Sequence, residues 1–105
     1  MNSGYVKFVK ENYKTGYFNY GDRPFQLDIS YVGDTTKVKI LYMGKYYEDL
    51  YVIVPDTKDL GKDEFFINPD LETDMVEELE RQGFIECTDK ISMAGDKQTK
   101  SYRVI

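Results

Sequence analysis

Residues 68–84 read NPDLETDMVEELERQGF, which is the clearest helical pattern in the chain. The spacing predicts one amphipathic helix over about residues 69–82. At 100° per residue its apolar side chains fall on a single stripe; they are Leu71, Met75, Val76 and Leu79. A helix with one apolar stripe is expected to pack on a sheet, so this stretch predicts an α+β fold.

Both ends of the predicted helix carry boundary signals. Asn68 is a preferred N-cap residue, and Pro69 suits the first helical position, where its missing N–H is not needed. Gly83 is expected to end the helix, with Phe84 as the apolar contact of a Schellman motif. The helix is therefore expected to fill the whole interval between Asn68 and Gly83.

The polar face of this helix is strongly acidic. Residues 70–82 carry six carboxylates and one arginine, and all of these except Glu72 lie on the face opposite the apolar stripe: Asp70, Asp74, Glu77, Glu78, Glu80 and Arg81. The local excess equals the formal net charge of the whole chain, −5, so the remaining residues balance. Glu77 is expected to pair with Arg81 one turn later. The predicted fold thus has one negative ridge on an otherwise neutral body.

Strand patterns surround the helix. Residues 24–31 and 37–42 alternate apolar and polar side chains, as half-buried strands do, and residues 50–54 predict a more fully buried strand. Further strands are expected at 5–10, 65–67, 84–87 and 101–105, the last two joined by a turn at 93–96. Together they predict a curved, mostly antiparallel sheet of about five to seven strands with a C-terminal hairpin.

Length and composition limit the class of protein. The 105 residues suit a single domain over residues 1–105. A single cysteine, Cys87, excludes an intrachain disulfide. The N-terminus has no apolar signal segment, and no run approaches the ~20 apolar residues of a membrane span. A cytoplasmic protein that does not contact the membrane is expected.

The sequence carries no catalytic signature. It has no histidine, which removes the commonest general base and the usual zinc ligand. It also has no glycine-rich phosphate loop. Cys87 is expected to be a small buried hydrophobe, because Glu86 beside it opposes a thiolate. We therefore predict no enzyme activity, no catalytic residues, no metal site and no cofactor.

The acidic face of the helix is the first candidate for partner binding. Its proposed contact residues are Asp70, Asp74, Glu77, Glu78 and Glu80. Carboxylates along a rigid helix can imitate the phosphates of a nucleic-acid strand and occupy a basic groove on another protein. The simpler interpretation is a hydrated helix face with no partner, because charge alone is a weak motif.

Tyrosines form the second candidate surface. The chain has 10 tyrosines, and those proposed to contact a partner, in turns, are Tyr17, Tyr20, Tyr46 and Tyr47. Tyrosine is enriched at protein-binding hot spots. Tyrosines interleaved with lysines can also stack the bases of a single-stranded nucleic acid. The acidic net charge opposes that second reading, because phosphate binding needs an excess of cations.

Several short segments resemble the bacterial family called domain of unknown function 4313, found in mobile elements and phages. The segments are Tyr13 with Gly16, Phe25-Gln26-Leu27, Tyr46-Tyr47, residues 50–55, Glu72, residues 79–86 and Tyr102-Arg103-Val104. Ile53 stands where the family has asparagine, and Tyr46 where it has proline. The resemblance implies an α+β fold and a mobile-element setting, and it brings no activity, cofactor or catalytic residue.

These observations predict a small, acidic, non-enzymatic interaction module of a bacterial mobile element or phage. Its expected partner is a protein with a basic surface, and its most concrete role is that of an anti-defence inhibitor. The alternative is a single-stranded nucleic-acid binder that uses tyrosines and lysines on a β surface.

Overall fold

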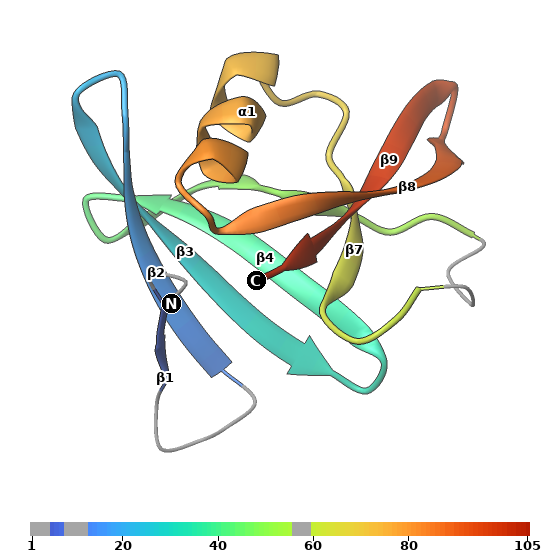
Figure 1. The fold of residues 1–105 in the computed structure, drawn as a ribbon, viewed down its shortest axis with the longest axis horizontal. Helices are drawn as coiled ribbons and strands as arrows, with labels where there is room; N and C mark the ends of the chain where they lie inside the picture. Colours follow the sequence, from blue (N-terminus) through green and yellow to red (C-terminus); the bar gives the residue numbers. More distant parts are fainter. Residues whose placement is uncertain (1–4, 8–12, 56–59) are drawn as a thin grey trace.

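Two antiparallel sheets and one short helix make up the fold (Figure 1). The computed structural model describes residues 5–7, 13–55 and 60–105, and these form nine strands. The predicted α+β class with mostly antiparallel pairing is confirmed. The expectation of one curved sheet with at most seven strands is wrong, because two tyrosine-rich segments pair as strands and the chain divides its strands between two sheets.

The first sheet follows the chain in order. Its strands are β1 (Tyr5–Lys7), β2 (Tyr13–Tyr20), β3 (Arg23–Val32), β4 (Thr35–Tyr42) and β5 (Lys45–Asp49). The predicted alternation is confirmed in β3 and β4, where Leu27 pairs with Ile40 and Ile29 with Val38, all fully buried. β1 covers Tyr5–Lys7 of the strand predicted at 5–10, and the rest of that prediction lies outside the described residues.

The second sheet contains the C-terminal hairpin. Its order is β6 (Tyr51–Val52), β7 (Glu64–Ile67), β9 (Lys97–Val104) and β8 (Ile85–Ala94). The hairpin is confirmed, but both strands are longer than predicted. They extend to the pair Ala94 and Lys97, which leaves Gly95 and Asp96 as the turn.

Leu50 carries the chain from one sheet to the other. Its N–H donates to the Val38 carbonyl at 2.8 Å, and its own carbonyl accepts from the Asn68 N–H at 2.8 Å. The side chain is fully buried. The predicted buried strand at 50–54 is reduced to β6, and Ile53 is 61% exposed although Leu50 and Val54 are buried.

Helix α1 (Thr73–Arg81) is shorter than predicted at its N-terminal end. The expected cap is wrong: Asn68 Nδ2 donates to the Asp49 carbonyl at 2.9 Å, and Asn68 Oδ1 accepts from the Asp70 N–H at 3.0 Å. Asn68 is thus fixed to β5, and Pro69 lies in a turn before the helix. Glu72 is the N-cap and makes no side-chain capping bond.

The C-terminal end of α1 is as predicted. The Phe84 N–H donates to the Leu79 carbonyl at 3.0 Å and the Gly83 N–H to the Glu80 carbonyl at 3.1 Å, which is the Schellman pattern. Gly83 takes a positive φ of 84°. The apolar stripe is buried against β2 and β8, with Leu79 fully covered.

The tyrosine-rich segments are strands and not turns. β2 alternates, so that Phe18 is buried while Tyr17 is 62% exposed. Tyr46 and Tyr47 lie in β5. Aromatic residues favour strands, and long pairing with β3 and β4 decides the outcome. Among the described residues, the one helix is too short and too polar to cross a bilayer.

Candidate functional site

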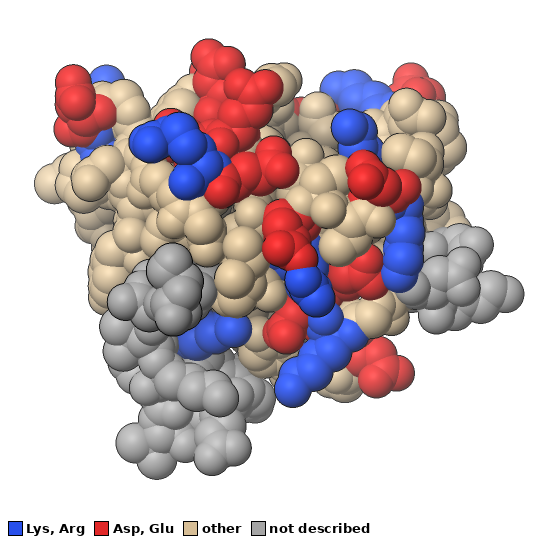
Figure 2. Space-filling model, viewed as in Figure 1, with Lys and Arg blue, Asp and Glu red and all other residues tan. Residues whose placement is uncertain are grey.

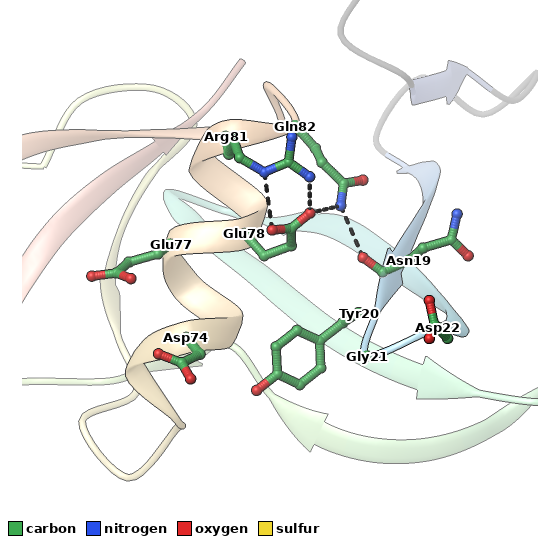
Figure 3. Close-up of a pocket in the computed structure, with 9 residues that line it drawn as sticks. All are labelled: Asn19, Tyr20, Gly21, Asp22, Asp74, Glu77, Glu78, Arg81 and Gln82. Atoms are coloured by element: carbon green, nitrogen blue, oxygen red, sulfur yellow. Dashed lines mark hydrogen bonds and ion pairs between the residues drawn. The ribbon is translucent and has the colours of Figure 1, made fainter.

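An open groove of about 750 Å³ runs between α1 and the tip of the β2–β3 hairpin (Figure 3). The helix supplies one wall, because its buried stripe holds it over the end of β2. Four carboxylates line the groove, namely Asp22, Asp74, Glu77 and Glu78. The groove therefore joins part of the predicted acidic face to a hairpin that lies more than 50 residues away in the sequence.

Glu78 holds one end of the groove together. Arg81 Nε donates to Glu78 Oε1 at 3.0 Å, and Arg81 Nη2 reaches Oε2. Gln82 Nε2 donates to the same carboxylate and, at 2.8 Å, to the Asn19 carbonyl of β2. The hydrogen bond from Arg81 is the largest cause of a lowered pKa at Glu78, and the hydrogen bond from Gln82 lowers this pKa further. The expected Glu77–Arg81 pair is wrong, because Arg81 forms its bidentate contact one residue nearer, with Glu78.

The remaining carboxylates divide into paired and unpaired groups. Asp70 forms an ion pair with Lys97 at the start of β9. Asp74, Glu77 and Glu80 are exposed and form no ion pair with any described residue. Figure 2 shows acidic side chains concentrated over the helix. Three of the five proposed acidic contacts are thus available to a partner without breaking an existing pair.

Tyr20 forms the aromatic wall of the groove. It projects from the end of β2 toward Asp74 across the groove (Figure 3). Its ring packs on buried Phe25 with centroids 6.3 Å apart, and Phe25 contacts Tyr47 edge-on at 5.2 Å. Loss of solvent raises the pKa of the Tyr20 hydroxyl, and the carboxylates of Glu72 and Asp74 raise it further. Tyr20 is thus fixed beside unpaired anions.

The other three proposed tyrosines lie outside the groove. The strand register places Tyr17 beside Gln26, Gln26 beside Leu41, and Leu41 beside Tyr46. This row, which we call the outer tyrosine row, crosses the face of the first sheet that points away from the core. Tyr46 and Tyr47 are adjacent in sequence but belong to opposite faces, since Tyr47 reaches Phe25 on the core side.

The register also fixes the charge around the outer tyrosine row. Lys39 is paired with Asp28 on one neighbouring strand and with Asp49 on the other. The cation is therefore flanked by two carboxylates. Among the described residues, this arrangement leaves the sheet face without the local excess of cations that a phosphate backbone requires.

The groove contains residues that the sequence interpretation did not propose. They include Asn19, Asp22 and Gln82. Gly21 and Asp22 both have positive φ, at 60° and 63°. A two-residue hairpin loop with positive φ at both positions favours glycine, asparagine and aspartate, so Gly21-Asp22 was the available signal. The position of this hairpin loop opposite α1 could not be predicted from the sequence pattern.

A second polar cluster lies inside the second sheet. Buried Glu64 accepts from Lys90 Nζ at 2.8 Å and from the Gly61 N–H at 2.5 Å. Burial alone would raise the pKa of Glu64, but the bonds from Lys90, Thr88 and Gly61 outweigh it and lower the pKa. Fully buried Ser101 accepts from the Lys90 N–H at 2.9 Å, where β8 bulges. These groups satisfy one another and stabilise the fold.

Cys87 is only partly buried, contrary to the prediction of a buried hydrophobe. Its Sγ contacts Asp89 Oδ1 at 3.3 Å, and loss of solvent raises the thiol pKa. Within residues 5–7, 13–55 and 60–105, no three cysteine or carboxylate side chains converge as metal ligands would. The groove and the outer tyrosine row contain the residues predicted to contact a partner, and they are the candidate surfaces.

Comparison with known proteins adds no assignment. The chain matches no protein-family model, no curated protein and no solved structure. Function is therefore inferred from the charges, rings and hydrogen bonds of the groove.

Proposed function

We propose that this protein is a non-enzymatic interaction module whose acidic groove binds a basic surface of another protein. One observation carries the proposal. Asp74 and Glu77 line the groove, are exposed to solvent, and have no cationic partner among the described residues. Their position in the groove separates them from Glu80, which is also exposed but does not line it.

The helix presents these charges rigidly. Met75 and Leu79 are 1% and 0% exposed, and the Schellman motif fixes the last turn. Gln82 ties that turn to the carbonyl of Asn19 on β2. Rigid presentation reduces the conformational entropy that is lost on binding. Carboxylates without a cationic partner also attract an oppositely charged protein over a distance near the Debye length.

The concrete form of this role is inhibition by imitation of nucleic acid. The carboxylates would occupy the positions of phosphates in the basic channel of a host nuclease. The resemblance to domain of unknown function 4313 suggests a bacterial mobile element or phage. The composition of the chain suggests a site of action in the cytoplasm. In this setting the protein would protect the element from a defence system of its host.

The alternative partner is a single-stranded nucleic acid on the outer tyrosine row. The exposed rings of Tyr17 and Tyr46, 62% and 61% accessible, favour it. Base stacking on such rings tolerates any sequence. The two carboxylates that flank Lys39 weigh against it, so the groove remains the preferred site.

A matched pair of variants tests the proposal. Asp74→Lys with Glu77→Lys reverses two groove charges, while Asp34→Lys with Asp96→Lys makes the same change in net charge in two exposed turns. The probe is a fluorescein-labelled peptide that alternates arginine and glycine, and anisotropy is measured over a salt series. We expect wild type and the turn variant to bind at low salt, and the groove variant to bind about tenfold more weakly.

Two results would overturn the proposal. One is equal loss of binding in the groove and turn variants, which would show that only net charge matters. The other is no binding of the peptide by wild type at low salt.

A second experiment identifies the native partner. The wild-type protein and the groove variant serve as paired baits in a bacterial lysate, and the native partner is the protein retained by wild type alone.

A further inference from the structure

We infer that this protein forms a symmetric dimer through β8, in which residues 91–94 of two copies pair as antiparallel strands. The pairing joins the second sheets of the two copies across a two-fold axis. The occupant of the strand edge is thus a second copy of this chain. The inference goes beyond the proposed function and does not rest on the acidic groove.

β8 is an edge strand of the second sheet. The strand order is β6-β7-β9-β8, so β8 pairs with β9 on one side and with no strand of the described residues on the other. Figure 1 shows the far end of the β8–β9 hairpin at the periphery of the molecule. An edge of this kind presents backbone N–H and C=O groups to which another strand can bind.

The far half of β8 differs from the edge strands β5 and β6. Proteins protect sheet edges with charged side chains or with very short strands. Three of the five residues of β5 are charged, and β6 has only two residues. Residues 91–94 of β8 carry no charge, and the side chains of Ile91 and Met93 are 53% and 49% exposed. This segment therefore combines a strand edge with exposed apolar side chains.

The turn of the hairpin determines the direction of the backbone groups in β8. Ala94 pairs with Lys97 around the two-residue turn at 95–96. The residues that flank such a turn form a hydrogen-bonded pair. Hydrogen-bonded and non-hydrogen-bonded pairs alternate along antiparallel strands, so Ser92 also directs its backbone groups toward β9.

Ile91 and Met93 consequently direct their backbone groups toward the outer edge. The Lys90 N–H supports this alternation, because it donates across to Ser101 Oγ of β9 at 2.9 Å. Lys90 and Ile91 thus alternate in the same way as Ser92 and Met93. Two residues of β8 present an N–H and a C=O to a second strand.

Only one two-fold register pairs both outward-facing residues. It places Ser92 opposite Ser92 of the second copy and Ile91 opposite Met93, and each of these mixed pairs then exchanges two backbone hydrogen bonds. An axis at Ile91 would place Met93 opposite Asp89, which lies in the bulge with a φ of 66°. An axis at Met93 would place Ile91 opposite Gly95 in the turn.

The side chains fit this register. Ile91 and Met93 of the two copies share one face and form an apolar cluster of four side chains, which covers surface that each copy exposes. Lys90 lies opposite Ala94 of the second copy. No two charges of the same sign therefore oppose each other across residues 90–94, although each chain has a net charge of −5. The segment is self-complementary, as a two-fold interface requires.

Sedimentation equilibrium tests the dimer over roughly 10 µM to 1 mM, because a contact this small should be weak. We expect the apparent mass of wild type to rise from 12.3 kDa toward twice that value. Met93→Lys places a charge at the edge and should remain monomeric. Met43→Lys makes the same substitution at a 78% exposed methionine in the turn after β4, and it should associate as wild type does.

Disulfide cross-linking tests the register. The two Ser92 Cα atoms would lie about 4.5 Å apart, as in a non-hydrogen-bonded pair, which is within the range of a disulfide. Ser92→Cys and Gln98→Cys, an exposed position on β9, are compared in a Cys87→Ser background under a mild oxidant. We expect Ser92→Cys to give several-fold more linked dimer on a non-reducing gel.

The outcomes are separate from those of the peptide experiment. A wild-type mass that stays at 12.3 kDa overturns the inference and leaves the β8 edge to a strand of another protein. Equal association of Met93→Lys and Met43→Lys also overturns it, as does equal cross-linking of Ser92→Cys and Gln98→Cys. If circular dichroism shows that Met93→Lys is unfolded, the wild-type mass and the cross-linking still decide. None of these results bears on the acidic groove.

Discussion

The acidic groove and the outer tyrosine row share the residue type that is most abundant among the aromatics, yet they differ in charge. In the groove, Tyr20 lies beside carboxylates that form no ion pair with a described residue. On the outer row, Tyr17 and Tyr46 lie on a face where Lys39 pairs with two aspartates across the strands. Of these two regions, only the groove has an excess of one sign among the described residues.

The two regions also differ in how they are built. The outer tyrosine row comes from neighbouring strands of one meander, so local pairing is enough to form it. The groove needs α1 to dock on the tip of a hairpin far away in sequence. The groove therefore depends on tertiary packing, and its binding properties should be sensitive to the helix in a way that those of the row are not.

The largest expected difference between the regions is in stability. Leu79 is fully buried on the helix, so Leu79→Ala should lower the free energy of unfolding by about 3 kcal/mol. Tyr17→Thr keeps a strand-forming residue on an exposed site and should change it by less than about 0.5 kcal/mol. Urea denaturation followed by circular dichroism measures both. Similar losses would show that α1 is not the more demanding element.

The next difference is in binding. Replacement of Asp74 and Glu77 by lysine should lower the affinity for the arginine–glycine peptide about tenfold. Two attractions of a few tenths of a kcal/mol each then become repulsions. Tyr17→Thr with Tyr46→Thr should weaken it less than twofold. Labelled oligothymidine, measured at the same low salt, should bind none of the three proteins. Tight, salt-sensitive binding of oligothymidine that is lost in the tyrosine variant would transfer the function to the outer row.

Two glycines test whether the helix end supports the groove. Gly83 and Gly44 have φ of 84° and 78°, and a Cβ added at either meets nothing within 4 Å. Alanine at each should cost about 1 kcal/mol of unfolding free energy through backbone strain alone. Gly83→Ala should also weaken peptide binding, because Arg81 and Gln82 precede it, whereas Gly44→Ala should not. Equal peptide affinities of Gly83→Ala and Gly44→Ala would show that the end of the helix does not support binding in the groove.

The smallest expected effect is the pH dependence of Glu78. Arg81 and then Gln82 lower its pKa, so this carboxylate stabilises the fold above its ordinary pKa of 4.5. That contribution is lost as pH falls through the lowered value. The melting temperature of Glu78→Gln should therefore fall less than that of wild type between pH 7 and pH 3. Glu80 is exposed and forms no ion pair with a described residue, so Glu80→Gln should follow wild type. Identical curves for all three proteins would contradict the role of the Glu78–Arg81 pair.

Local patterns predicted the elements whose signals are complete within a few residues. The apolar stripe of α1, the Schellman end at Gly83 and the alternation of β3 and β4 each depend on neighbours in sequence. The start of the helix was predicted wrongly, because Asn68 bonds to the Asp49 carbonyl in preference to capping the helix. The tyrosine-rich strands were missed, because pairing across the sheet outweighs the turn signals of Gly16 and its neighbours.

The sequence alone determined the residue types of the candidate site: the acidic excess at 70–80 and the abundance of tyrosine. Tertiary structure alone decided which of these residues meet. It separated Tyr17 from Tyr20, paired Asp70 with Lys97, and placed Asp22 opposite Asp74. The physical reason is range: helix periodicity and strand alternation act over a few residues, whereas a groove forms where buried side chains bring distant segments together.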